Sequence, residues 1–217
     1  MSASYTAEDR QRAYAQLAAD KAVLADKGWF PATSGNMSIR LGNDPISKDK
    51  PSYHFAITAS GKDKSVHTPE DYLIVNEQGK PIEATSLKPS AETLIHCELY
   101  RLTGCGAVYH VHTVYNNVIS EHYGDQGTVP IQGVELIKAL NIWEENAEIR
   151  VPIVPNYADI PSIAQLVEGA LNREVPGILL RNHGIYAWGA TPFEAKRHVE
   201  AFEFLFEYLY RKLLLRG

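Results

Sequence analysis

The spacing of apolar residues predicts a helix near the start of the chain. Thr6 has the chemistry of an N-cap, Glu8 and Asp9 favour a helix N-terminus, and Gly28 is a residue type that ends helices. The apolar face of this helix is formed by Tyr14, Leu17, Ala18 and Leu24. We therefore expect a helix from Thr6 to Gly28 that packs on one side.

The middle of the chain predicts short strands mixed with helices. Residues 37–41, 53–58 and 72–76 read as strands, and Glu77–Lys80 reads as a hairpin-like turn. Ser90 is expected to cap a helix that runs to Leu102, with Gly104 past its end. Further strands are expected over 107–112, 149–154, 177–181 and 185–188, and further helices over 114–123, 134–140 and 163–171.

The last helix has the clearest start signal. Thr191, Pro192 and Glu194 supply an N-cap, a proline in the first turn and a glutamate three residues after the cap. The helix should run to Leu214, and its later part is apolar on more than one face. Such a helix is either deeply buried or packed against another subunit, and we favour the second.

Helices and strands alternate irregularly, so the pattern favours a mixed α/β layered domain over a regular series of βαβ units. A chain of 217 residues fits one large domain, which we take to span residues 1–217. The polar segment 42–52 reads as a surface loop inside that domain.

Charge and composition exclude several classes of function. The formal net charge is −5, without a basic stripe, which argues against a nucleic-acid or anionic-membrane partner. The N-terminus lacks an apolar signal segment, and no apolar stretch is long enough for a bilayer, so we expect a cytoplasmic protein. Cys97 and Cys105 are expected to be small buried hydrophobic residues.

The strongest chemical signal is His110-Val111-His112. Side chains alternate along a strand, so both histidines should project from the same face and can reach one metal ion. A pair of this kind is weak evidence alone, but His183, beside the flexible Gly184, supplies a third imidazole. Three neutral imidazoles leave coordination positions open, as in catalytic zinc sites. We interpret the remaining histidines as surface or hydrogen-bonded structural residues, with His96 the least certain: His54, His67, His96, His122 and His198.

Five short motifs occur in an order that resembles the class II aldolase family, which includes zinc-dependent sugar-phosphate aldolases and epimerases. They are Thr33-Ser34-Gly35-Asn36, Thr58-Ala59-Ser60-Gly61-Lys62, Ser90-Ala91-Glu92, His110-Val111-His112 and Asn182-His183-Gly184. The resemblance implies an αβα fold with a central, mainly antiparallel sheet. It also implies a homotetramer with active sites near subunit interfaces and one Zn²⁺ per subunit.

The same resemblance assigns candidate site residues. His110, His112 and His183 correspond to the zinc ligands. Small and hydroxyl residues correspond to a cradle for a substrate phosphate, with Lys62 as an added charge: Ser34, Gly35, Asn36, Ser60, Gly61 and Ser90. Without the metal motif, these glycine–serine turns would read as ordinary surface loops.

Two glutamates correspond to acid/base residues of different family members. Glu92 matches the aldolase carboxylate, and Glu135 matches the acid/base residue of dehydratases in the family. Either could instead be an ordinary helix carboxylate. We favour Glu135 for the proton transfers and Glu92 as an assistant or a neighbour of the zinc.

Within the family, the likeness favours an enzyme that removes water from a 1-phosphorylated 2-ketopentose. It rests on the segments 28–36, 132–138 and 181–189. Two alternatives remain: a sugar-phosphate aldolase or epimerase with the same site, and a non-catalytic interaction module like the head domain of adducin. Such modules can lose the zinc histidines, which this chain keeps.

Overall fold

The computed structural model describes residues 5–42, 46 and 52–215. The predicted surface loop over 42–52 lies almost wholly outside the described residues. The helices are α1 (Ala7–Asp26), α2 (Thr93–Thr103), α3 (Val114–His122), α4 (Ile160–Ala170) and α5 (Pro192–Leu214), with short 3₁₀ segments η1 (Pro31–Thr33), η2 (Gly124–Gln126) and η3 (Glu135–Leu140). The strands are β1 (Asn36–Leu41), β2 (His54–Thr58), β3 (Tyr72–Asn76), β4 (Ala107–Val111), β5 (Thr128–Gln132), β6 (Glu148–Val154), β7 (Gly177–Leu180) and β8 (Gly184–Gly189).

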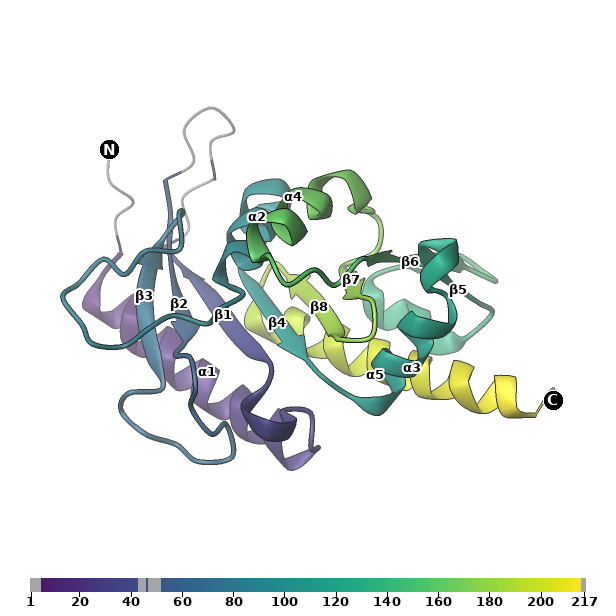
Figure 1. Ribbon diagram of the computed structural model, residues 1–217, viewed down its shortest axis with the longest axis horizontal. Coiled ribbons are helices and arrows are strands. Elements are labelled where there is room, and N and C mark those ends of the chain that lie inside the picture. Colours follow the sequence, from purple (N-terminus) through teal and green to yellow (C-terminus); the bar gives the residue numbers. More distant parts are fainter. Residues whose placement is uncertain (1–4, 43–45, 47–51, 216–217) are drawn as a thin grey trace.

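The strands form one eight-stranded sheet in the order β3-β2-β1-β4-β8-β7-β6-β5 (Figure 1). Every neighbouring pair is antiparallel except β6 and β7, which are parallel. Helices α1 and α5 pack on one face, against β1, β4 and β8, while α2 and α4 pack together over the other face. The expected αβα arrangement with a mainly antiparallel sheet is therefore confirmed.

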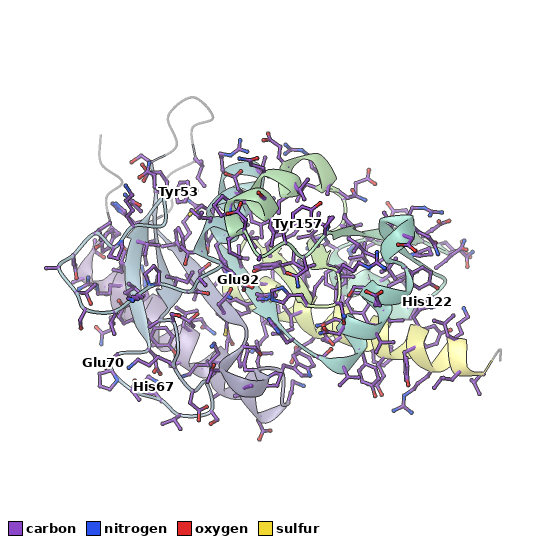
Figure 2. The ribbon with its side chains drawn as sticks, in the orientation of Figure 1. Tyr53, His67, Glu70, Glu92, His122 and Tyr157 are labelled. Atoms are coloured by element: carbon purple, nitrogen blue, oxygen red, sulfur yellow. The ribbon has the colours of Figure 1, made fainter. Side chains whose placement is uncertain are left out.

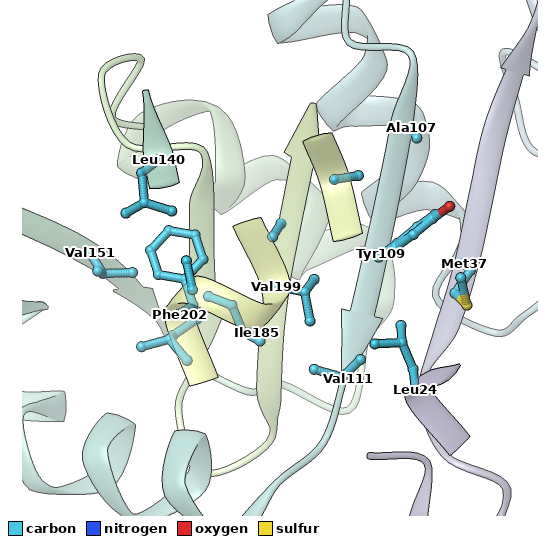
Figure 3. Packing of buried hydrophobic residues seen from close by; sticks show 14 of the residues in the cluster. Leu24, Met37, Ala107, Tyr109, Val111, Leu140, Val151, Ile185, Val199 and Phe202 are labelled. Carbon is cyan, nitrogen blue, oxygen red and sulfur yellow. The ribbon is translucent and has the colours of Figure 1, made fainter. Parts of the chain in front are cut away.

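Strand β4 shows how one strand serves both faces. Ala107, Tyr109 and Val111 belong to the apolar cluster under α1 and α5 (Figure 3). Val108 belongs to the cluster under α2 and α4. His110 follows Val108 by two residues, so it points to the side of α2. This alternation places a polar imidazole on the face opposite to the larger apolar cluster.

The helix starts follow the sequence where capping chemistry is strong. Thr6 accepts a hydrogen bond from the Asp9 amide, and Thr191 accepts one from the Glu194 amide. The prediction that Ser90 caps α2 is wrong, because the helix begins at Thr93 and Glu92 occupies the cap position without a side-chain cap. The Ser90 carbonyl instead accepts from the Thr93 amide at 3.1 Å, which forms a turn before the helix.

Helix α5 keeps large apolar side chains in solvent even though one side of it is buried. Ala195, Val199, Phe202, Leu205 and Phe206 are buried against the sheet, whereas Phe204 and Tyr208 are 53% and 40% exposed. No described helix is long and apolar enough to cross a membrane.

Candidate metal centre

Three histidines and one glutamate meet where β4 ends. His110 is the fourth residue of β4, and His112 follows the strand directly, with its amide donating to the Trp29 carbonyl at 3.1 Å. The Nε2 atoms of the two rings lie 2.8 Å apart. Both rings therefore project to one side, as the His-X-His spacing predicted.

His183 and Glu92 complete the cluster from two other parts of the fold. His183 lies in the tight turn between β7 and β8, and Glu92 precedes α2. The Glu92 carboxylate lies 2.9 Å from His183 Nε2 and 3.2 Å from His110 Nε2. Ligand atoms of all four residues lie within 4.8 Å of one another, and Figure 2 places Glu92 near the middle of the molecule.

The orientation of His110 shows that this cluster suits a cation. His110 Nδ1 lies 3.0 Å from the Ile185 carbonyl, which can only accept, so Nδ1 must carry the hydrogen. A neutral ring then presents the Nε2 lone pair to Glu92 and to His112. Acceptors that face one another are unfavourable unless a positive charge lies between them, and a metal ion held by these residues would supply that charge.

Burial keeps the imidazoles in the form that binds metals. It lowers the pKa of His110 to about 4 and, together with the neighbouring histidines, the pKa of His112 to about 2. Burial alone would raise the pKa of Glu92, but His110, His183 and Asn36 outweigh it and hold that pKa well below its usual range. The site thus combines the neutral imidazoles of His110 and His112 with an ionised carboxylate, and imidazole and carboxylate donors are typical of Zn²⁺ sites.

Close packing fixes the rings around this point. A side chain at Gly184 would place its Cβ 2.6 Å from the Val111 carbonyl oxygen and 2.7 Å from the His110 ring, so only glycine fits there. The Tyr186 ring stacks on the His110 ring, with centroids 3.9 Å apart and planes 10° from parallel. The His110 imidazole is consequently held between the sheet and its neighbours before any ligand binds.

A buried polar network supports Glu92 from behind. The Asn36 amide nitrogen donates to the Glu92 carboxylate at 2.6 Å, and its carbonyl oxygen accepts from His96 Nε2. The other nitrogen of His96 lies 2.7 Å from Ser38 Oγ, which lies 2.8 Å from the Tyr100 hydroxyl. His96, the uncertain case in the sequence, is thus a structural histidine with both nitrogens engaged.

The residues expected to bind phosphate lie on three segments of the chain: 34–36, 60–62 and Ser90. Ser60 donates its amide to the Lys88 carbonyl at 2.9 Å, and Ser90 donates its amide to the Thr58 carbonyl at 3.2 Å, so these two segments run antiparallel around the Ala59–Pro89 bridge. Ser34 and Gly35 precede β1, where Ala32 (φ 51°), Thr33 (φ 68°) and Gly35 (φ 70°) adopt left-handed backbone conformations. The side-chain amide of Asn36 is engaged elsewhere, because its nitrogen donates to Glu92 and its oxygen accepts from His96.

The two lysines of the Gly61–Lys64 segment have different surroundings. Lys62 forms an ion pair with Glu70 at 2.9 Å on the surface. Lys64 is 5% exposed, and its ammonium donates to the Thr33 carbonyl at 2.6 Å. Sequence reasoning missed Lys64, since nothing in the letters Gly-Lys-Asp-Lys indicates which lysine turns inward.

Glu135 does not join the cluster within the described part of one chain. It begins η3, its side chain is 84% exposed, and it pairs with Lys138 at 2.8 Å. The cysteines match their expectation, because Cys97 and Cys105 are both buried free thiols.

The sequence profile described as the Class II Aldolase and Adducin N-terminal domain matches residues 15–210. The chain therefore belongs to this family. It is 52% identical to methylthioribulose-1-phosphate dehydratase of Persephonella marina over 210 residues, which is 97% of this chain and 94% of that protein. It is also 52% identical to the dehydratase of the same name from Bacillus subtilis, over 92% of each chain.

A solved structure agrees with the family assignment. The l-fuculose-1-phosphate aldolase from Thermus thermophilus matches with a TM-score of 0.71 and 28% identity, over 96% of this chain and 98% of that one. The similarity of the chain to these dehydratases and to this aldolase thus agrees with the family that the five motifs indicated.

Proposed function

We propose that the protein removes water from 5-methylthioribulose 1-phosphate to give 5-methylthio-2,3-dioxopentyl phosphate, a step of L-methionine salvage. The observation that carries the proposal is the cluster of His110, His112, His183 and Glu92, in a chain about half identical to dehydratases of that name. The reaction removes the C3 proton and the C4 hydroxyl, and the resulting enol becomes the diketone. Water is the other product, so no oxidant or reductant is needed.

In this proposal the three histidines hold one Zn²⁺ per subunit. When bound, the metal supplies Lewis acidity that stabilises negative charge on the C2 and C3 oxygens. The protein's part is to keep the imidazoles neutral and fixed, through burial and the Ile185 carbonyl bonded to His110. These features support a cation-binding role for the site and agree with zinc.

Two carboxylates are available for the proton transfers. Glu92 lies against the histidines and is ionised, so it can accept the C3 proton beside the metal. Glu135, which the sequence favoured, is exposed in a single subunit and would reach the substrate only from a neighbouring copy. The proposal keeps both, with one glutamate removing the C3 proton and either one protonating the departing C4 hydroxyl.

The phosphate cradle in this proposal consists of Ser34, Gly35, Asn36, Ser60, Gly61 and Ser90, and a lysine of the segment Gly61–Lys64 adds positive charge. Backbone N–H groups and hydroxyls of small residues suit phosphate oxygens. Anchoring the phosphate end holds the C3 hydrogen toward the base, which raises the rate by orientation.

A homotetramer is also part of the proposal. Phe204 and Tyr208 leave apolar area in solvent on α5, and such exposure is typical of a subunit contact. Sedimentation velocity should give the mass of four chains, and the variant Phe204→Glu should lower it. Sedimentation of the unaltered protein as a monomer would contradict this part of the proposal alone.

The product identity tests the reaction. Zinc-loaded protein is incubated with 5-methylthioribulose 1-phosphate, the products are separated, and their masses are measured by mass spectrometry. Dehydration yields one phosphorylated product that is lighter by one water. Cleavage of the C3–C4 bond would instead yield dihydroxyacetone phosphate and methylthioacetaldehyde, and would make the protein an aldolase.

A further inference from the structure

The most unusual charge outside the metal cluster is the ammonium of Lys64. The residue is 5% exposed, yet within the described part of the chain no carboxylate oxygen lies within ion-pair distance of it. Lys21 provides the contrast: it is equally buried but is paired with Asp71 at 2.5 Å. A buried ammonium without a counter-ion is costly, so its retention points to a ligand of opposite charge.

The surroundings of Lys64 have the features of an anion site. Its ammonium donates to the Thr33 carbonyl at 2.6 Å and lies 5.9 Å from the centre of the Phe30 ring. An ammonium has three hydrogens to donate, so this contact leaves donor capacity for a ligand. Next to Thr33 in the chain, Ser34 Oγ is buried without a hydrogen-bond partner among the described residues.

The backbone of the loop 32–35 is also strained, and strain of this kind is typical of functional sites. Ala32 and Thr33 have φ of 51° and 68°, conformations that cost energy for residues other than glycine. Gly35 has φ of 70°, and a Cβ there would lie 2.7 Å from the His110 carbonyl oxygen. The strained loop thus runs from the Lys64 contact into β1, where Asn36 pairs with His110 of the neighbouring strand β4.

The charge of Lys64 also interacts with residues of the metal cluster. Burial, followed by the like charge of Lys21, lowers the pKa of Lys64 to about 8, while the Glu92 carboxylate opposes that change. The charge of Lys64 in turn contributes to the lowered pKa of His112. A ligand between the loop and the histidines would meet this ammonium at one end.

We infer that Lys64, together with Ser34 Oγ, binds the phosphate group of the substrate, and that Lys62 does not. This inference rests on the proposed function for the identity of the substrate. The chemistry it requires is that of a phosphate dianion, which can accept hydrogen bonds from both the ammonium and the hydroxyl. Lys62 already has Glu70 as its partner at the surface.

The test compares Lys64→Met with Lys62→Met, using inorganic phosphate as the probe on protein stripped of metal by a chelator. Removing the metal ensures that the measured phosphate binding does not come from phosphate bound to a metal ion at the histidines. Phosphate binding is measured by calorimetry and by the rise in unfolding temperature, against chloride at equal ionic strength. We expect Lys64→Met to weaken phosphate binding roughly 10- to 100-fold, Ser34→Ala to weaken it less, and Lys62→Met to leave it unchanged.

The unfolding temperature without phosphate separates a ligand role from a structural one. Removing an unpaired buried charge should leave that temperature unchanged or raise it, whereas the loss of a structural lysine would lower it. Equal phosphate affinity in Lys64→Met and the parent protein would overturn the inference, as would absence of phosphate binding to the parent.

Turnover assays separate this inference from the proposed function. With zinc and 5-methylthioribulose 1-phosphate, Lys64→Met should show a KM raised at least tenfold relative to Lys62→Met. If the parent protein fails to turn over this substrate but loses phosphate binding in Lys64→Met, the proposed substrate is wrong while the phosphate site stands.

Discussion

The Asn36 amide nitrogen donates to the Glu92 carboxylate over 2.6 Å, and this contact connects the metal cluster to the core of the domain. Its direction is fixed, because the Asn36 carbonyl oxygen faces His96 Nε2, which must then carry the hydrogen. His96 Nδ1 is left to accept from Ser38, which accepts from Tyr100. The last hydrogen bond of this network is therefore donated by the Asn36 amide to Glu92, and it fixes the position of that carboxylate.

Replacing Asn36 tests whether this residue positions Glu92 or binds phosphate. Asn36→Ala removes a hydrogen bond to a charged group, which is worth about 1.5–3 kcal/mol, so we expect kcat to fall roughly tenfold or more. KM should change little if the residue acts through Glu92. A raised KM with normal kcat would instead support the phosphate role predicted from the sequence. Asn172→Ala, at a surface turn where the side chain accepts from the Glu174 amide, is the control.

Replacing His110 tests the metal site. His110→Ala should remove stoichiometric metal and activity, because a third of the imidazole set is lost, while the secondary structure remains. His122→Ala, on the exposed end of α3, should keep both metal and turnover. Metal content by emission spectroscopy and circular dichroism are measured on the same samples. Full turnover by His110→Ala would show that the metal assignment is wrong.

The two glutamates are compared by isosteric change. Glu92→Gln keeps the size of the side chain but removes the carboxylate beside the histidines, so we expect kcat to fall at least 10²-fold. The kcat of Glu135→Gln should fall by a similar factor only if a neighbouring subunit delivers this residue to the site. Rates are measured with metal content checked, since loss of metal from Glu92→Gln would indicate a ligand role. Normal rates for both variants would remove both residues from the mechanism.

Glu203 gives a prediction about stability and pH. Its carboxylate accepts from Thr113 Oγ1 at 2.5 Å and from the Asn116 amide nitrogen at 2.7 Å, in the helix turn that follows His112. Burial raises its pKa from 4.5 to about 7. The folded protein then holds this proton more tightly than the unfolded chain does. The contribution of Glu203 to the free energy of unfolding is therefore fully present at low pH and is lost as the pH rises from about 4.5 to 7.

The size of that effect is about 3 kcal/mol at pH 8, which Glu203→Gln should abolish because glutamine mimics the protonated acid. Chemical unfolding of the parent and the variant at pH 5 and pH 8 measures it. Glu200→Gln, at a residue paired with Lys27 and on the same helix as Glu203, should keep the pH dependence of the parent. An identical pH dependence in all three proteins would contradict the burial argument.

The sequence predicted the parts of the fold that depend on local chemistry. Thr191 and Pro192 marked the start of α5, and the β-branched and aromatic content of residues 107–112 marked β4. Strand β5 was not predicted, and it contains Pro130, a residue type that is rare inside strands. It is tolerated there because β5 is at the edge of the sheet, where a missing amide hydrogen breaks no ladder on the open side.

The site was predictable where one motif carries two or more ligands. His110 and His112 needed only the alternation of a strand, and the ordered motifs added His183 and Glu92. The inward turn of Lys64 and the engagement of Asn36 depend on contacts between segments distant in sequence, such as Lys64 with Thr33. No local pattern encodes these contacts, so they required the fold.

The most direct test of the account is a crystal structure of the zinc-loaded protein with diffraction measured across the zinc absorption edge. The account predicts one anomalous peak per subunit at roughly 2.0–2.1 Å from the Nε2 atoms of His110, His112 and His183. Absence of a peak at these atoms, or a peak that leaves His183 uncoordinated, would contradict the claim that the three imidazoles share one metal ion.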